Sequence, residues 1–128
     1  MSQENVEVVR QSLEAYRRGD LEGALAGVHP QIVWNPFEEG EMRGVDAVRA
    51  HLARWENEWE ELETTPEEFI DAGDHVIAVV HFRGRGRGSG VEVDARSYAV
   101  YTLRDGRTIS MHEFIERTEA LAAAGLSE

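Results

Sequence analysis

The segment VEVDARSYAVYTLRDGRTISMHEFIE, residues 91–116, decides the fold. Two runs rich in β-branched and aromatic residues flank Asp105-Gly106, a dipeptide that strongly favours a two-residue hairpin turn. With Arg104 placed opposite Arg107, the antiparallel ladder follows by counting outward from the turn. This register pairs Tyr98 with Glu113, Val100 with Met111, and Arg96 with Ile115.

These three pairs share one face of the predicted hairpin, because cross-strand partners point to the same side. That face would place an arginine, a phenol and a carboxylate among aliphatic side chains, a composition that predicts a small-molecule pocket around Glu113. The opposite face would carry Ala99 and Tyr101. A register shifted by one residue is the alternative, in which Glu113 is a solvent-facing strand residue.

Composition bounds the class of protein. A chain of 128 residues, 41% of them hydrophobic and 30% charged, is expected to form one soluble globular domain over residues 1–128. We expect no membrane span and no signal peptide, and therefore a cytoplasmic location. Without cysteine or lysine, thiolate and Schiff-base chemistry are excluded. A net charge of −12 disfavours nucleic acid as a partner.

Helical spacing of apolar residues predicts three helices before the hairpin. The first spans about 2–18, with Ser2 as its N-cap and Gly19 as its C-terminal cap. Asp20 caps a shorter second helix, which ends before His29-Pro30. The third spans about 45–60, and its apolar face carries Val48, Leu52, Trp55 and Trp59.

Further strands are predicted between and after these helices. Residues 31–34 form a short strand that stops at Asn35-Pro36, followed by an acidic loop over 37–43. Residues 67–71 form another, and HVIAVVHFR (75–83) is apolar enough to be covered on both faces. RGRGRGSG (83–90) is either an RNA-binding tract or a hairpin tip, and the acidic chain favours the tip. A helical tail over 118–126 ends the chain.

Helices followed by antiparallel strands predict an α+β fold, with three N-terminal helices covering one face of a strongly curved sheet. Ala99 and Tyr101 on the other face would need a partner. A symmetric homodimer through this exposed sheet face is the expected way to bury them.

Several segments resemble the SnoaL-like proteins of the nuclear transport factor 2-like superfamily, which includes ketosteroid isomerase, polyketide cyclases and limonene epoxide hydrolase. The resemblance lies in RRGDLEGAL (17–25), HPQIVWNP (29–36), MRGVDAVRAHL (42–52) and, above all, DGRTISMHEFIERTEALAAAGL (105–126). It implies a cone-shaped α+β barrel of mixed and antiparallel strands around one apolar pocket, without a cofactor and usually dimeric. The fold hosts many functions, so the reaction stays open.

The resemblance transfers to the site only in part. The ketosteroid isomerase base falls at Asn35, which cannot take a proton, and its tyrosine falls at Ser12. Limonene epoxide hydrolase matches better, with Asn35 as its asparagine, Arg96 as its arginine and Glu113 as its water-activating acid. Val33 and Tyr98 depart from its pattern. Polyketide cyclases of this type place one acid at the Glu113 position, so Glu113 is common to two mechanisms.

The candidate catalytic residues are therefore Glu113, Tyr98, Arg96 and Asn35. Arg96 is equally well explained as a surface residue beside Asp94, and Asn35 as a turn residue before proline. Pocket-lining candidates are Tyr16, Trp34, Trp55, Val100 and Met111, whose default role is packing.

The five histidines show no metal-ligand spacing, and HEFIE (112–116) is not H-E-x-x-H, so neither a metal nor another cofactor is expected. The expected partner is a small hydrophobic molecule. Acid/base chemistry by Glu113 in a cyclisation, isomerisation or hydration is the leading hypothesis. A non-catalytic ligand-binding module and a dimeric interaction module are the alternatives.

Overall fold

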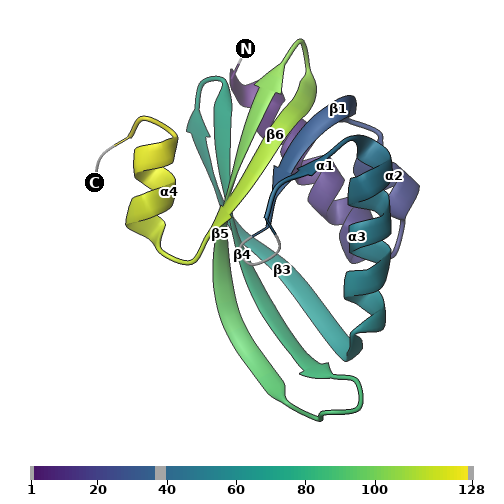
Figure 1. Cartoon of the computed structure of the whole chain (residues 1–128). Helices are drawn as coiled ribbons and strands as arrows, with labels where there is room; N and C mark the ends of the chain where they lie inside the picture. The colour runs from purple at the N-terminus through teal and green to yellow at the C-terminus, as the bar shows by residue number, and fades with distance from the viewer. Residues whose placement is uncertain (1, 37–39, 127–128) are drawn as a thin grey trace.

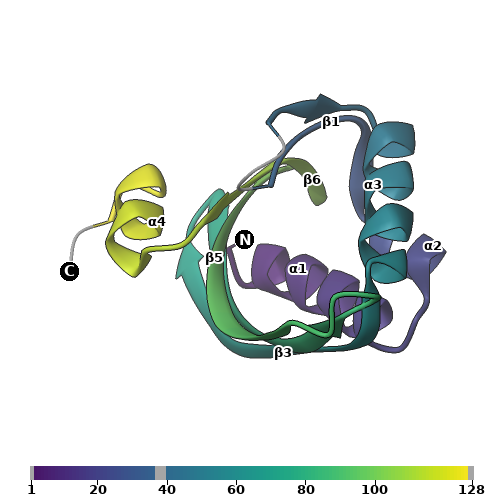
Figure 2. The same ribbon diagram turned by 60° about the horizontal axis from the view of Figure 1, so that its bottom comes forward.

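The computed structural model describes residues 2–36 and 40–126 and contains one strongly curved sheet with helices on both of its sides (Figures 1 and 2). In chain order the elements are α1 (Ser2–Arg17), α2 (Leu21–Leu25), β1 (Val28–Asn35), β2 (Met42–Arg43), α3 (Val45–Asn57), β3 (Trp59–Ala72), β4 (His75–Gly86), β5 (Glu92–Arg104), β6 (Arg107–Phe114) and α4 (Arg117–Ala123). The predicted α+β class is confirmed.

The sheet is mixed and has the strand order β2-β1-β6-β5-β4-β3. β1 runs parallel to β6, and the other neighbours are antiparallel. Figure 2 shows the sheet curving around α1, with α3 at its open side and α4 outside the curve. The three N-terminal helices therefore lie on the concave side, as the sequence predicts.

Two of the predicted caps are confirmed, one at the end of α1 and one at the start of α2, whereas Ser2, the predicted N-cap, is itself the first residue of α1. Gly19 has a φ of 81°, the left-handed conformation that ends α1. The Asp20 side chain accepts a hydrogen bond of 2.9 Å from the Gly23 backbone nitrogen at the start of α2. The sharp turn that results brings α2 against α1.

The end of the third helix was predicted wrongly. α3 stops at Asn57, and Trp59 begins the 14-residue strand β3, which also includes the predicted 67–71 strand. A Cβ at Gly84 would lie 2.7 Å from the Glu61 carbonyl oxygen and 2.9 Å from a Trp59 ring carbon. The close pairing of β3 with β4 at this glycine overrides the helical spacing of Trp55 and Trp59.

The other strands are longer than predicted. β1 begins at Val28 and includes Pro30, and β4 continues to Gly86, so the arginine- and glycine-rich tract is a strand end and hairpin tip. Part of the predicted acidic loop forms β2, while its residues 37–39 lie outside the described residues.

The register of the central hairpin corrects the prediction by one residue. Asp105 and Gly106 have φ angles of 52° and 77°, and Arg104 does lie opposite Arg107. However, Leu103 pairs with Thr108 and Thr102 with Ser110, so Ile109 is an extra residue in a β-bulge. Beyond the bulge, Ala99 is opposite Glu113, Tyr101 opposite Met111, Val100 opposite His112 and Tyr98 opposite Phe114.

The bulge decides which residues face the concave side. Ala99, Tyr101 and Met111 belong to the inner core with Val6 and Val9 of α1. Val100 and Ile77 form an outer cluster with Leu121 of α4. The prediction that Ala99 and Tyr101 need a partner subunit was therefore wrong, because they are buried inside the barrel, and α4 of the same chain covers part of the outer face.

Candidate functional site

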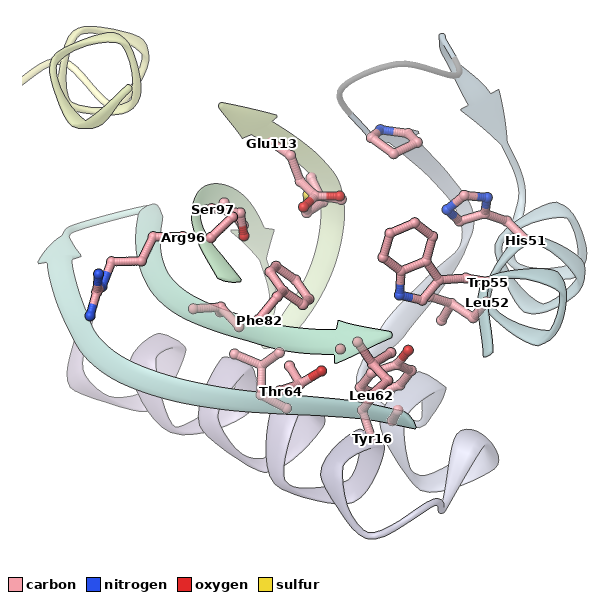
Figure 3. A pocket seen from close by; sticks show the side chains of 18 of the residues that line it. Tyr16, His51, Leu52, Trp55, Leu62, Thr64, Phe82, Arg96, Ser97 and Glu113 are labelled. Atoms are coloured by element: carbon pink, nitrogen blue, oxygen red, sulfur yellow. The ribbon is translucent and has the colours of Figure 1, made fainter. Parts of the chain in front are cut away.

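A cavity of about 360 Å³ lies between the concave face of the sheet and helices α1 and α3 (Figure 3). Its walls are mostly apolar and aromatic, with few polar groups, which is typical of small-molecule sites. It is lined by Leu13, Tyr16, Ala24, Trp34, Pro36, His51, Leu52, Trp55, Trp59, Leu62, Thr64, Val80, Phe82, Gly84, Val93, Ala95, Arg96, Ser97, Ala99, Tyr101, Met111 and Glu113. Of the pocket residues predicted from the sequence, Tyr16, Trp34, Trp55 and Met111 are present.

Glu113 is the acid of this cavity. It lies on β6, two residues after the buried Met111, and Figure 3 shows its carboxyl group at the cavity wall. Burial raises the pKa of Glu113 from its usual 4.5 to about 7, and a hydrogen bond from the Ser97 side chain lowers it only in part. Its side chain is half-buried because it borders the cavity. At neutral pH the group can therefore both take and give a proton.

Two tyrosines lie within electrostatic reach of this acid. Burial raises the pKa of Tyr16, and the carboxylates of Glu56 and Glu113 raise it further. Burial and Glu113 likewise raise the pKa of Tyr101. Both phenols therefore stay neutral hydrogen-bond donors. The Tyr16 hydroxyl is buried without a hydrogen-bond partner among the described residues, as are the indole N–H groups of Trp34 and Trp59.

Arg96 does not carry its charge into the cavity, so of its two interpretations the structure agrees with the surface residue and not with the catalytic one. Its stem borders the cavity, but Nε and Nη2 donate to the Glu67 carboxylate over 2.6 and 3.1 Å. Figure 3 shows the guanidinium pointing away from Glu113. The catalytic interpretation does not fit because Arg96 follows the outward alternation of β5, whereas Glu113 follows the inward alternation of β6.

Tyr98 and Val100 also lie on the other face. Both pack against the outer cluster that includes Leu121 of α4, and neither lines the cavity. The bulge at Ile109 is the physical reason, since it changes the partner of Glu113 from Tyr98 to Ala99. The predicted contact between the Tyr98 phenol and the Glu113 carboxylate is therefore corrected.

Asn35 ends β1 and does not line the cavity either. Trp34 and Pro36, the residues on either side of it, do line the cavity, so the alternation of the strand turns Asn35 outward. It pairs with His112, an exposed residue of β6. The asparagine, arginine and acid suggested by the resemblance to limonene epoxide hydrolase are thus not brought together.

Three polar residues of the cavity were not predicted. Ser97, 1% exposed, and Thr64 come from β5 and β3, and His51 comes from α3 on the wall across from Ser97 (Figure 3). His51 precedes Trp55 by four residues and follows Val48 by three, so helical spacing would have placed it on the apolar face of α3. Ser97 could be found only once the bulge was known.

Over 2–36 and 40–126 there is no cluster of three or more His, Cys, Asp or Glu side chains that could hold a metal ion. Within the same ranges, no helix is both long enough and apolar enough to cross a lipid bilayer.

Comparison with known proteins gives a family match and a consistent fold. Residues 9–111 match the SnoaL-like domain. A nuclear transport factor 2-like protein from Burkholderia xenovorans is 32% identical, with a TM-score of 0.74 and 95% of each chain covered. One from Burkholderia thailandensis is 26% identical, with a TM-score of 0.81, covering 94% of this chain and 96% of the other.

A third structure, a nuclear transport factor 2-like protein of unknown function from Burkholderia pseudomallei, is 25% identical. Its TM-score is 0.79, and the alignment covers 93% of this chain and 95% of that one. No protein of curated function matches the chain.

Proposed function

Because the chain belongs to the SnoaL-like domain family, we propose that it binds a compact hydrophobic molecule in the cavity and acts on it by cofactor-free acid/base catalysis. Glu113 is the proton-transfer group of this proposal. The supporting observation is the carboxyl group itself, which lies among aromatic and aliphatic side chains with a pKa raised to about 7. Carboxyl groups perturbed in this way are concentrated at functional sites.

The chemistry follows from the protonation of Glu113. As a carboxylate it can take a proton from a C–H bond next to a carbonyl, or from a water molecule. As a carboxylic acid it can return that proton to a developing oxyanion or to the oxygen of an opening epoxide. Ser97 fixes the orientation of the carboxyl group. Cyclisation, isomerisation and hydration are the reactions that such a group supports without a metal or an organic cofactor.

The proposal is tested with Glu113→Gln, which keeps the shape of the side chain and removes its proton transfer. Wild-type protein is incubated with panels of polyketide-like, terpenoid and epoxide compounds, and products are identified by mass spectrometry. We expect the variant to lose about 10²- to 10⁴-fold of any turnover found. Glu63→Gln, the same change at an exposed position of β3, is the control. Turnover that survives in Glu113→Gln would remove Glu113 from the mechanism.

A binding module without catalysis is the second candidate, because Asn35, Tyr98 and Arg96 do not place their functional groups around the cavity with Glu113. In this case the cavity binds a hydrophobic molecule saturably and yields no product.

The predicted homodimer, a third element of the proposal, would use the part of the outer sheet face that α4 leaves open, next to the exposed Ile115. Light scattering at working concentration measures it, and a monomer would rule it out.

A further inference from the structure

The carboxyl group of Glu113 has a hydrogen-bond donor beside it but no positively charged partner among the described residues. Among the described residues, no basic side chain pairs with its carboxyl group, and Ser97 supplies the hydrogen bond that it accepts. Arg96, the one arginine in the cavity lining, is bound to Glu67 on the outer face. A carboxylate in such a site needs a compensating positive charge, which is either a proton on the group itself or a cation that enters the cavity.

The walls around this acid are suited to a cation. Six elements each contribute one aromatic side chain to the lining: Tyr16, Trp34, Trp55, Trp59, Phe82 and Tyr101. Trp55 packs edge-on against Trp59, with ring centroids 5.2 Å apart and planes at 64°, and against Phe82 at 6.5 Å and 78°. Aromatic rings that surround a site from several sides are the usual partners of alkylammonium groups, through the negative faces of their π systems.

We propose that the cavity takes an organic cation, a compact hydrophobic body carrying an alkylammonium group, and that the ammonium lies beside Glu113. This inference rests on the proposed function, since it names the class of ligand for the same cavity. The net charge of −12 adds to it, because a negative field raises the local concentration of cations. Carboxylates and phosphates are disfavoured ligands, because the one arginine in the lining directs its charge elsewhere.

The affinity for a cation should depend on pH because Glu113 of the protein, and not the ligand, changes its charge. Burial raises the pKa of Glu113 to about 7, so the carboxylate that attracts a cation forms as the pH rises through neutrality. The other titratable groups around it are Tyr16 of α1 and Tyr101 of β5, whose raised pKa values keep them neutral, and Glu56 and His51 of α3.

A matched pair of probes tests the charge alone. Benzyltrimethylammonium carries a permanent positive charge that does not titrate, and neopentylbenzene is its neutral isostere with carbon in place of nitrogen. Binding of each is followed by tryptophan fluorescence at pH 5.5 and pH 8.5. We expect the cation to bind at least about ten-fold more tightly at pH 8.5 than at pH 5.5, since only a few per cent of a group with a pKa near 7 is ionised at the lower pH. Binding of the isostere should change little.

Glu113→Gln separates the charge from the cavity. We expect this variant to bind the cation equally at both pH values and about ten-fold more weakly than wild-type protein at pH 8.5, while its affinity for the isostere is kept. Glu63→Gln should behave as wild type. If the isostere binds and the cation shows neither the pH dependence nor the loss in Glu113→Gln, the ligand class is wrong but the hydrophobic cavity of the proposed function stands. If neither probe binds, both proposals fail.

Discussion

The two faces of the curved sheet treat the same kind of side chain in opposite ways. On the concave face, burial raises the pKa of Glu113 to about 7. On the outer face, the hydrogen bonds from Arg96 lower the pKa of Glu67, and those from Arg117 lower the pKa of Glu68. The difference lies in the surroundings, since the outer carboxylates have solvent and a guanidinium, whereas the inner one has aromatic walls and a serine.

The carboxylates of the outer face and the carboxyl group in the cavity differ in their effect on the free energy of unfolding. A solvated ion pair on the outer face contributes little to the free energy of unfolding. An isolated carboxyl group in the cavity reduces that free energy whenever it is ionised. Sequences keep such a group where function requires it, so the contrast between the faces is itself an argument for the site.

The largest effect on stability is expected on the part of the outer sheet face that α4 covers. Ile77 points outward from β4 but is 1% exposed, because it packs in the cluster that α4 completes. Ile77→Ala should lower the free energy of unfolding by about 2–5 kcal/mol, measured by urea denaturation. Ile115→Ala, at a position 63% exposed, is the control and should stay within about 0.5 kcal/mol. Equal, small effects would mean that α4 does not protect the outer face in solution.

A smaller effect with a defined pH profile is expected from Glu113→Gln. Below about pH 4.5 the folded and unfolded chains both carry a protonated Glu113, so the group has no cost. Between pH 4.5 and about 7 only the folded chain keeps the proton, and the free energy of unfolding therefore falls as the pH rises, by at most about 3 kcal/mol. Water in the cavity would reduce this amount.

The variant removes that loss. Its free energy of unfolding should equal that of wild-type protein near pH 4 and exceed it near pH 8, approaching a difference of about 3 kcal/mol. The pKa of Glu113, followed through its carboxyl carbon shift by NMR, gives the independent value. Parallel stability curves for the two proteins, together with a pKa near 4.5, would place Glu113 in solvent and abolish the contrast between the faces.

Local patterns in the sequence predicted most of the architecture, because each depends on a few adjacent residues. The caps at Gly19 and Asp20 and the turn at Asp105-Gly106 follow from backbone preferences that short-range chemistry fixes. The strand 75–83 follows from its apolar run. The family resemblance then added the cone-shaped barrel of mixed and antiparallel strands around one pocket, which no local pattern contains.

The site was predicted less well because it depends on a single inserted residue. Ile109 looks like any other strand residue in the sequence, yet the bulge there exchanges Tyr98 for Ala99 opposite Glu113. Glu113 and Met111 still share one face and line the cavity, since both follow the bulge on the same strand. Arg96 was misplaced for the same reason as Tyr98, and Ser97 was overlooked. A register error of this kind gives a residue the wrong cross-strand partners even where the face of the residue itself is predicted correctly.

The smallest effect should come from Glu67→Gln, and it examines whether the two faces are independent. The lowered pKa of Glu67 means that its pairing with Arg96 stabilises the fold above the usual carboxyl pKa and is lost as the pH falls below it. The variant should therefore lose a little stability at neutral pH, a smaller change than either of those above. Added salt should reduce the loss because both side chains are in contact with solvent.

The more informative readout of Glu67→Gln is the pKa of Glu113. The stem of Arg96 borders the cavity, so a guanidinium released from Glu67 that turned inward would lower the pKa of Glu113. We expect the NMR titration of Glu113 to be unchanged in Glu67→Gln, because the outward alternation of β5, and not the ion pair, directs Arg96 away from the cavity. A fall in that pKa would show that Glu67 keeps the cavity free of positive charge, and the charged groups of the outer face would then belong to the site.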